Sequence, residues 1–403
     1  MHFLKILSWL IFIAINIFLL YHLVFPVFLF IVHWFLHKNP DILLKRYKKI
    51  TDKEFDFAVI TAAHQETMFI APFVDSLIRQ EYQNFVIYVV ADDCDISGLH
   101  FSDDKVVLLK PESPLHSKIK SIKYAIDHFR REHDALVIFD SDNLAHPDFL
   151  KNLNRYFQRG FAAVQANMLS KNLDSGFARM DAMGHTYYNF LERKIKMELG
   201  LTSAILGLGI AMDMDLYRRV VYKNNLGGFD KKLQVNLTLS VPMIAYAGDV
   251  IVYDEKVENA AAFEKQRTRW IFTYFEYFKD SIFLFRKSFK PFNAGRLLLA
   301  ISMLRPPMIL TISVSIICMA SCFLIFPVFG WIWLAIFILF TINFILIVAS
   351  QSQQEGVWKA LFSIPALLFR QIKSLLKIKQ AKKNFLQTEH KKVLYINEVL
   401  HKI

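Results

Sequence analysis

The segment Ala135-Leu-Val-Ile-Phe-Asp140-Ser-Asp142-Asn143 indicates the fold class of this 403-residue chain. Its first five residues are all apolar, which is typical of a strand in a parallel sheet whose two faces are both covered by helices. Two carboxylates and an amide follow directly. In doubly wound α/β domains, ligands bind beyond the carboxyl ends of such strands. The segment therefore predicts a buried strand that ends in a binding site.

The surrounding sequence repeats the same pattern of an apolar run, a polar turn and a helical segment. The predicted strands are 55–61, 85–91, 106–109, 135–139, 244–246 and 250–253, and the predicted helices are 70–80 and 119–131. Repeated strand–helix units of this kind predict a doubly wound α/β domain.

Polar residues follow three of these strands at the point where each strand ends. They are Ala63-His-Gln-Glu66, Asp92-Asp93-Cys94-Asp95 and Asp140-Ser-Asp142-Asn143. Because the carboxyl ends of parallel strands lie at one edge of a sheet, we expect these groups to form one site. The alternative is that the acids cap the helices that follow, as Asp95 could do.

Asp140 and Asp142 are two residues apart in a loop, so both carboxylates can face one hard cation. Mg²⁺ and Mn²⁺ are typically held by one or two carboxylates together with substrate phosphates. Such a metal would act as a Lewis acid that neutralises a leaving diphosphate. A solvated turn is the alternative, but the position after a buried strand favours a metal site. The histidines His64, His116 and His185 lack the spacing of zinc ligands.

Three apolar segments are long enough to cross a membrane. From residue 6 to residue 36 there is no Asp, Glu, Lys or Arg, and a span needs about 20 residues. Pro26 divides this run into a span and a shorter apolar stretch over 27–36. The predicted spans are 6–24, 308–326 and 328–349, the last two as a hairpin. A cleaved signal peptide would be shorter, and a soluble hairpin seldom has apolar runs this long.

The distribution of charge predicts the topology. The chain is 54% hydrophobic and carries a formal charge of +12, which lies in residues 1–50 (+5) and 370–403 (+7) next to the predicted spans. Lys and Arg beside spans mark the cytoplasmic side. We therefore expect a multi-pass protein of the cell (cytoplasmic or inner) membrane whose middle segment and C-terminus face the cytosol. The basic residues of 361–378 predict an in-plane amphipathic helix on anionic lipid, and nucleic acid is excluded as a partner.

Taken in order, the motifs resemble those of membrane-bound, inverting family 2 glycosyltransferases, the group that contains relatives of cellulose and hyaluronan synthases. The resemblance covers about 55–285. Its most specific part is Gln266-Arg267-Thr268-Arg269-Trp270, which matches a Gln-X-X-Arg-Trp signature. The Asp140-Ser-Asp142 motif and the Gly-rich segment Ile205–Ala211 match as well. The resemblance implies a nucleotide-sugar-binding domain of the GT-A type, flanked by transmembrane and interfacial helices.

The resemblance also implies roles for individual residues. Those expected to bind the nucleotide sugar, with UDP as the expected nucleotide, are Thr61, Ala63, Glu66, Asp92, Asp93, Lys118 and Asp140. Those expected to hold Mg²⁺ or Mn²⁺ are Asp140 and Asp142, and those on the acceptor side are Gly207, Gly209 and Trp270. The expected catalytic residues are Asp230, Gln266, Arg269 and Trp270. Arg269 offers fixed positive charge for a leaving group, and Trp270 offers a flat face for a sugar ring or an interfacial anchor.

The general base is where the sequence departs from the family. Members usually have a Glu-Asp pair after a Gly-Gly-Phe-like turn, whereas Gly227-Gly228-Phe229 precedes Asp230 with no such pair. If Asp230 is the base, it also opens the following helix, where it could instead be only an N-cap. If Val235-Asn236 replaces the pair, the base is lost, because an amide cannot accept the proton. The length of chain needed before the strand 244–246 favours Asp230.

These features predict a membrane-anchored, metal-dependent glycosyltransferase with a lipid-linked or saccharide acceptor, since three spans are few for a polymer channel. The alternative is a degenerate, inactive protein that binds a nucleotide sugar or a partner. A transporter is disfavoured because we expect no ionisable residue of a transport path in the spans. The expected divisions are a transmembrane segment (1–37), a cytosolic transferase domain (38–262), interfacial helices (263–296), a transmembrane hairpin (297–350) and a basic tail (351–403).

Overall fold

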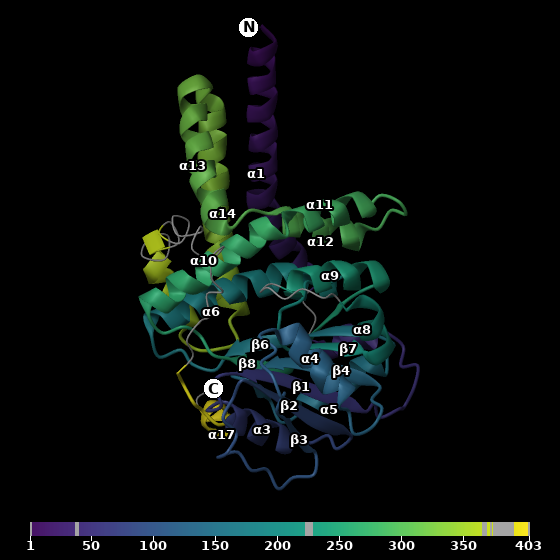
Figure 1. Ribbon diagram of the computed structural model, residues 1–403. Helices are drawn as coiled ribbons and strands as arrows, with labels where there is room; N and C mark the ends of the chain where they lie inside the picture. Colours follow the sequence, from purple (N-terminus) through teal and green to yellow (C-terminus); the bar gives the residue numbers. More distant parts are fainter. Residues whose placement is uncertain are drawn as a thin grey trace.

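The protein is described by a computed structural model that covers residues 2–36, 40–221, 229–364, 369–370, 373 and 391–401. A mixed eight-stranded sheet lies at one end of the molecule, and three long helices project from the other (Figure 1). Shorter helices lie between the sheet and these three. The predicted α/β class with flanking apolar helices is confirmed.

The sheet has two halves that differ in strand direction. Its strands are β1 (Phe57–His64), β2 (Phe85–Asp92), β3 (Val106–Leu109), β4 (Ala135–Asp140), β5 (Leu144–Ala145), β6 (Ala163–Ser170), β7 (Ile210–Asp213) and β8 (Ala245–Asp254). Their order is β3-β2-β1-β4-β7-β6-β8-β5. The first four are parallel, and β7 is antiparallel to both β4 and β6. We call β3-β2-β1-β4 the parallel half and β7-β6-β8-β5 the mixed half.

The two predicted strands at 244–246 and 250–253 are in fact one strand, β8. Its pairing with β6 shifts register between Ala166 and Asn167, opposite Ala247 and Ile251. An irregularity of this kind accommodates extra residues without ending the strand. The Gly-Asp pair at 248–249, between the two predicted strands, therefore lies inside one strand.

Helices cover both faces of the parallel half, as the apolar run at 135–139 predicts. One face packs against α3 (Ile70–Ile78) and α5 (Phe149–Phe157). The other packs against α4 (Lys118–Asp127), α8 (Met214–Val220) and α9 (Phe229–Ser240). Because successive side chains of a strand alternate between faces, every residue of β2 is buried. This leaves the strand ends as the part of the half that can meet a ligand.

A layer of helices separates the sheet from the three long ones (Figure 1). It contains α6 (Gly176–Asn189), the π-helix η1 (Phe190–Lys194), α7 (Ile195–Glu198), α10 (Ala260–Glu276), α11 (Phe278–Lys287) and α12 (Ala294–Leu304). An apolar cluster that includes Leu23, Met183, Phe263 and Ile347 joins this layer to the long helices. The remaining short helices are α2 (Pro40–Lys45), η2 (Val357–Ser363) and α17 (Ile396–Leu400).

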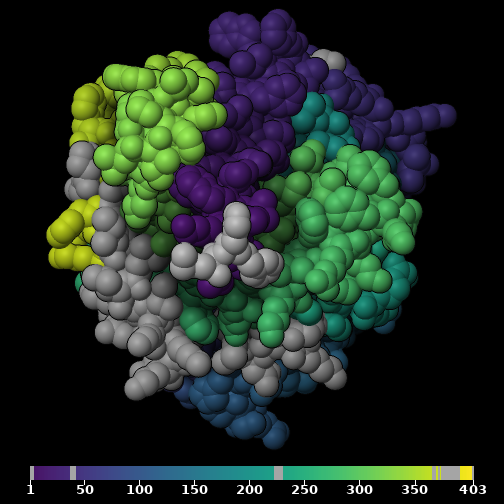
Figure 2. Space-filling model, turned by 90° about the horizontal axis from the view of Figure 1, so that it is seen from above, coloured from purple at the N-terminus to yellow at the C-terminus, as the bar shows by residue number. Residues whose placement is uncertain are grey.

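The three long helices are apolar enough to span a membrane: α1 (His2–Leu36), α13 (Met308–Ile325) and α14 (Pro327–Gln351). The predicted division of the first segment at Pro26 is wrong, because α1 continues through that proline. In the view along the spans, α1 stands between the α13–α14 hairpin and the α11–α12 pair (Figure 2). The indole N–H of Trp333 donates to Asn16 Oδ1 at 2.8 Å, which ties α14 to α1.

Two predictions fall wholly or partly on residues outside the description. The turn Gly227-Gly228 is one. The other is the in-plane helix over 361–378, of which residues 361–363 form the end of the 3₁₀ helix η2. The described C-terminal residues return to the sheet, where Leu394, Ile396 and Val399 pack on Leu144 and Tyr253.

Candidate active site

Asp92 ends β2 and is held by three partners. Asp92 is buried, with only 2% of its surface exposed. Its Oδ1 accepts from the backbone N–H of Leu115 at 2.6 Å, and its Oδ2 accepts from that of His116 at 2.9 Å. Nδ1 of His64 lies 3.0 Å from Oδ2. Asp92 therefore fixes the loop that leads into α4. Its contact with His64, 28 residues earlier in the chain, has no local sequence signal.

Three residues at these strand ends have left-handed backbone conformations although none is glycine. Their φ angles are 63° at Gln65, 54° at Asp93 and 49° at His116. Such conformations cost about 1–3 kcal/mol each and cluster at functional sites. Asp93 is exposed and accepts a hydrogen bond from Gln65 Nε2 at 2.8 Å. The strained backbone thus lies where the loops after β1 and β2 meet the start of α4.

The residues predicted at the end of β1 differ in accessibility. Thr61 and Ala63 are buried within the strand, and the Thr61 hydroxyl donates to the carbonyl of Phe139 at 3.5 Å. Glu66 lies in the turn that follows and is partly exposed. Only Glu66 of these three presents a side chain beyond the edge of the sheet.

Lys118 connects the parallel half to the mixed half. Its ammonium forms an ion pair with Asp140 and donates to the carbonyl of Gly207 at 2.8 Å. Lys118 is the first residue of α4, and Gly207 precedes β7. The structure thus brings together a predicted nucleotide-binding residue, a predicted metal ligand and the Gly-rich segment.

The residues of the Asp-Ser-Asp motif suit a metal whose other ligands come from a substrate. The Asp140 side chain is 41% exposed, whereas Asp142 is buried and its carbonyl accepts from Lys171 Nζ at 3.0 Å. Among the described residues, no group of three or more His, Cys, Asp and Glu side chains forms a metal site. Two carboxylates fit Mg²⁺ or Mn²⁺ when phosphates complete the coordination.

Charged residues at the end of β8 bind the neighbours of this motif, Asn143 and Lys171. Asn143 Nδ2 donates to Asp254 Oδ1 at 3.0 Å, and Lys256 Nζ lies 2.9 Å from Asp254 Oδ2. Glu255 pairs with Lys171 at 3.5 Å. The Asn143–Asp254 contact spans 111 residues of sequence, and the Lys171–Glu255 pair joins two different segments as well, so no local pattern could have revealed them.

Asp230 lies beside the same Gly-rich segment, and Arg269 is within reach of the charges of Asp230 and Asp140. A Cβ placed on Gly207 would be 3.9 Å from Cβ of Asp230. Burial lowers the pKa of the Arg269 guanidinium, and the nearby carboxylates of Asp140 and Asp230 oppose that shift. Asn236 points elsewhere, since its amide donates to the carbonyl of Val220 at 3.2 Å. Of the two alternatives for the base, Asp230 is the one near Gly207 and Arg269.

The Gln-X-X-Arg-Trp signature lies on α10. Gln266 is buried, and its Oε1 has no hydrogen-bond partner among the described residues. Trp270 is 47% exposed. The guanidinium of Arg267 lies 4.2 Å from the centre of the Trp270 ring and pairs with Asp181. One face of the indole is therefore covered by Arg267.

Gly209 is required by the packing of the sheet. Its φ is +59°, and a Cβ there would lie 3.0 Å from Val252 Cγ1 and 3.1 Å from Ala166 Cβ. Its N–H donates to the carbonyl of Ile138 at 2.8 Å, which links the Gly-rich segment to β4. A structural role thus accounts for Gly209, whereas Gly207 lies beside Lys118 and Asp230.

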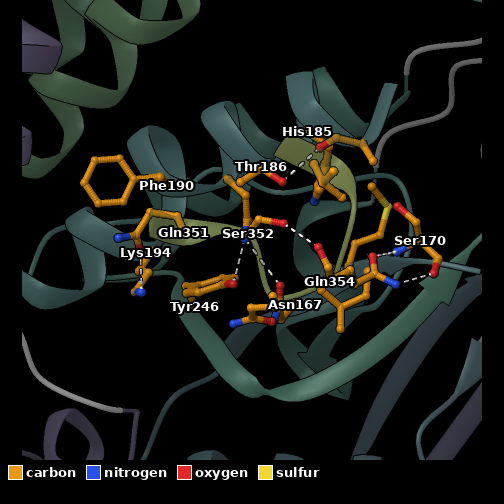
Figure 3. Close-up of a pocket in the computed structure, with 16 residues that line it drawn as sticks. Asn167, Ser170, His185, Thr186, Phe190, Lys194, Tyr246, Gln351, Ser352 and Gln354 are labelled. Atoms are coloured by element: carbon orange, nitrogen blue, oxygen red, sulfur yellow. Dashed lines mark hydrogen bonds between the residues drawn. The ribbon is translucent and has the colours of Figure 1, made fainter. Parts of the chain in front are cut away.

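A polar pocket lies away from these residues, between β6, α6 and the segment after α14 (Figure 3). Gln354 bonds to both backbone groups of Ser170, each at 2.7 Å, and Asn167 bonds to Gln353 at 2.8 Å. Burial is the largest effect that lowers the pKa of His185 in this pocket, and the charge of Lys256 adds to it. None of the predicted site residues lines this pocket, whose amides bind one another.

Comparison with known proteins identifies the family. Residues 55–273, more than half of the chain, match the model of the family described as "Glycosyltransferase like family 2". The mannosyltransferase PcManGT from Pyrobaculum calidifontis, solved in complex with GDP-Man and Mn²⁺, is 15% identical with a TM-score of 0.52, over 90% of this chain and 99% of that one. TarS of S. aureus is 14% identical with a TM-score of 0.40, over 84% of this chain and 57% of that one. No curated protein matches. The chain therefore belongs to the family 2-like glycosyltransferases and has their GT-A-type fold.

Proposed function

We propose that the chain is an inverting, membrane-anchored glycosyltransferase that moves a sugar from a nucleotide diphosphate to a lipid-linked or saccharide acceptor. The observation that carries the proposal is the group of charges around Gly207. Lys118 and Arg269 supply positive charge, and Asp140 and Asp230 both act on Arg269. This group combines cations for a leaving diphosphate with a carboxylate for an acceptor hydroxyl.

Asp230 is the group that we assign as general base. The acceptor oxygen attacks the anomeric carbon from the face opposite the nucleotide, and Asp230 takes the hydroxyl proton. The bond to the diphosphate breaks on the other face, so the configuration inverts. Lys118 and Arg269 provide fixed positive charge where the diphosphate departs. Gln266, Trp270 and Gly207 complete the acceptor side, and Gly209, also predicted there, supports it through the packing of the sheet.

Asp140 and Asp142 would hold Mg²⁺ or Mn²⁺, and the ion when bound supplies Lewis-acid stabilisation of the leaving group. The nucleotide would contact the ends of β1 and β2 through Glu66 and through Asp92 or Asp93, while Thr61 and Ala63, buried in β1, would position these loops. We expect UDP as the nucleotide. Because the Pyrobaculum neighbour was solved with GDP-Man, guanosine donors also belong in the test.

We place the transferase domain and the C-terminus on the cytosolic side of the cell membrane. Three helices are long and apolar enough to span it. Lys and Arg follow α1 at residues 45–49, and Arg286, Lys287, Lys290 and Arg296 precede α13. Both clusters lie at the end of the spans that faces the sheet, which is the arrangement expected for a cytoplasmic side.

The test is the release of nucleoside diphosphate by the purified full chain with Mn²⁺, a panel of UDP- and GDP-sugars, and lipid-linked and free saccharide acceptors. We expect release with one donor, and its loss with EDTA or in Asp142→Asn. Donor binding without release in any combination would instead support an inactive nucleotide-sugar-binding protein. Neither binding nor release would contradict both.

A further inference from the structure

A second cavity lies where the spans meet the helical layer. It is formed by one side of α1, the η1–α7 segment and the end of α12. The residues that line it are Tyr21, His22, Phe25, Pro26, Leu29, Leu191, Glu192, Lys196, Ile301, Ser302 and Arg305. Arg305 comes three residues before α13 begins. The cavity is therefore level with the end of the α13–α14 hairpin that faces the sheet.

Buried charges on the protein side of this cavity leave one positive charge in excess. Glu192 Oε2 lies 2.7 Å from Lys196 Nζ, and Glu192 Oε1 lies 2.5 Å from an Arg305 nitrogen. Lys196 Nζ also donates to Ser302 Oγ at 3.1 Å. Glu192 and Lys196 are buried. A buried charge without a counterion is unfavourable, so the cluster is complementary to an anion.

Glu192 is itself ionised. Its burial opposes ionisation, but the charges of Lys196 and Arg305 outweigh that effect and hold the pKa of Glu192 far below its usual value. Both carboxylate oxygens are engaged by these two cations. A further anionic ligand would therefore meet Lys196 and Arg305, which have more donors than Glu192 can accept.

α1 contributes an unsatisfied polar group to the same cavity. His22 is buried, with 5% of its surface exposed. Its Nε2 has no hydrogen-bond partner among the described residues. Four residues later, Pro26 has no N–H to donate to the carbonyl of His22. The charges of Glu192 and Arg305 both act on His22. An unpartnered polar group of α1 thus lines the same cavity as Glu192 and Arg305.

A lipid would reach this cavity between α1 and α12, both of which line it. α1 packs against α14, α13 and α7, whereas α12 packs mainly against α11. The view along the spans shows α1 next to the α11–α12 pair (Figure 2). A lipid headgroup entering there would keep its chains beside α1, whose outer side chains are apolar and exposed.

The cavity is connected to the candidate active site through a short stretch of backbone. The carbonyl of Glu192 accepts from the N–H of Ala204 at 2.9 Å. From Ala204 the chain runs to Gly207 beside Asp230. Arg193, next to Glu192, is within reach of the charge of Asp230. The wall of the cavity and the general base are thus linked through residues 192–207.

We propose that this cavity binds the phosphate of an anionic lipid that carries the acceptor, with Lys196, Arg305 and His22 as its donors. The lipid's role as acceptor rests on the function proposed above. Its binding does not, so the binding can be tested without any donor sugar.

The experiment is native mass spectrometry of the purified full chain with three probes: an isoprenyl monophosphate, phosphatidylcholine and inorganic phosphate. We expect one isoprenyl monophosphate to bind in preference to phosphatidylcholine. Arg305→Gln and His22→Phe should each weaken its binding at least about tenfold, since each removes a donor to a charged group. Arg296→Gln, on the same helix as the control, should leave it unchanged.

Folding is checked by thermal unfolding, and Arg305→Lys, which keeps the charge, should restore part of the affinity. His22→Phe removes no hydrogen bond, so it should retain the stability of the wild type. Equal binding of both lipids, or equal effects of Arg305→Gln and Arg296→Gln, would overturn the proposal. Inorganic phosphate that binds the cavity and displaces the lipid completely would overturn the lipid assignment. Lipid binding by a chain that releases no nucleotide would overturn only the acceptor role.

Discussion

The parallel and mixed halves of the sheet build their parts of the site in different ways. In the parallel half, each strand ends in its own polar residues, and Asp92 and Asp140 are fixed by neighbours from adjacent loops. Next to the mixed half, around the Gly-rich segment that leads into β7, the important groups come from helices distant in the sequence and meet only after folding, as Asp230 and Arg269 do. The topology of a parallel sheet thus supplies a site at predictable positions, whereas an antiparallel arrangement supplies a platform for other elements.

This comparison assigns donor binding to the parallel half and the transfer step to the residues around the mixed half. If the assignment is correct, substitutions in the two halves should separate donor affinity from turnover. Lys118 bridges the halves through Asp140 and Gly207, so it is the one predicted site residue expected to affect both.

The largest effect is expected for Asp230→Asn. The amide keeps the size of the side chain but cannot take the hydroxyl proton, so turnover should fall about 10³-fold. Donor affinity should remain within about twofold, because donor binding belongs to the other half. Steady-state kinetics and calorimetric titration with the donor nucleotide measure the two quantities.

Asn236→Ala is the matched control for the base. Asn236 lies on the same helix but bonds to the carbonyl of Val220, so its loss should leave turnover within about threefold. A greater loss of turnover in Asn236→Ala than in Asp230→Asn would reverse the assignment of the base.

Asp92→Asn should have the opposite signature. The variant loses the charge that accepts two backbone N–H groups, at about 1.5–3 kcal/mol for hydrogen bonds to a charged group. The loop before α4 then loses its anchor, so donor affinity should fall about 10–100-fold. Turnover at saturating donor should change little. Asp93→Asn, at the exposed neighbour, is the control, and a larger effect there would make Asp93 the nucleotide ligand and Asp92 a positioning residue.

The sequence was informative where a local pattern implies a position. The apolar run at 135–139 and its polar end predicted a strand and its site, and the apolar segments at 308–326 and 328–349 predicted two spans that match α13 and α14. The predicted division at Pro26 was wrong because a proline in a long apolar helix can be tolerated when neighbouring elements pack around it. The expectation of spans without ionisable groups overlooked His22. The Glu192–Arg305 and Asn143–Asp254 contacts join residues over a hundred positions apart, which no local pattern encodes.

Gly209→Ala tests whether the mixed half depends on packing. A Cβ at a φ of +59° lies too close to Val252 and Ala166, so the free energy of unfolding should fall by about 1–3 kcal/mol. Thermal unfolding of the purified chain measures this. Gly184, inside α6, has open space at its Cβ, so Gly184→Ala should be neutral or slightly stabilising. The same sign for both variants would contradict a packing role for Gly209.

The smallest effects are expected for the pH dependence of stability. Each half of the sheet contains a buried histidine whose protonation matters for it. Burial lowers the pKa of His133, which contacts Asp56 and the Tyr88 hydroxyl in the parallel half. Burial lowers the pKa of His185 further, beside the mixed half. Both are therefore neutral in the native chain at a pH where the unfolded chain, with a pKa of about 6.5, takes up protons.

Stability should consequently be complete above about pH 7 and fall as the pH drops below 6.5. His133→Gln should flatten the upper part of this decline. His185→Gln should flatten more of it, because a group with a more strongly lowered pKa continues to destabilise the native chain at lower pH. Thermal unfolding between pH 7.5 and 5 distinguishes the two. An equal or smaller effect of His185→Gln would mean that water reaches the polar pocket beside α14, and that the mixed half is less well sealed than the parallel half.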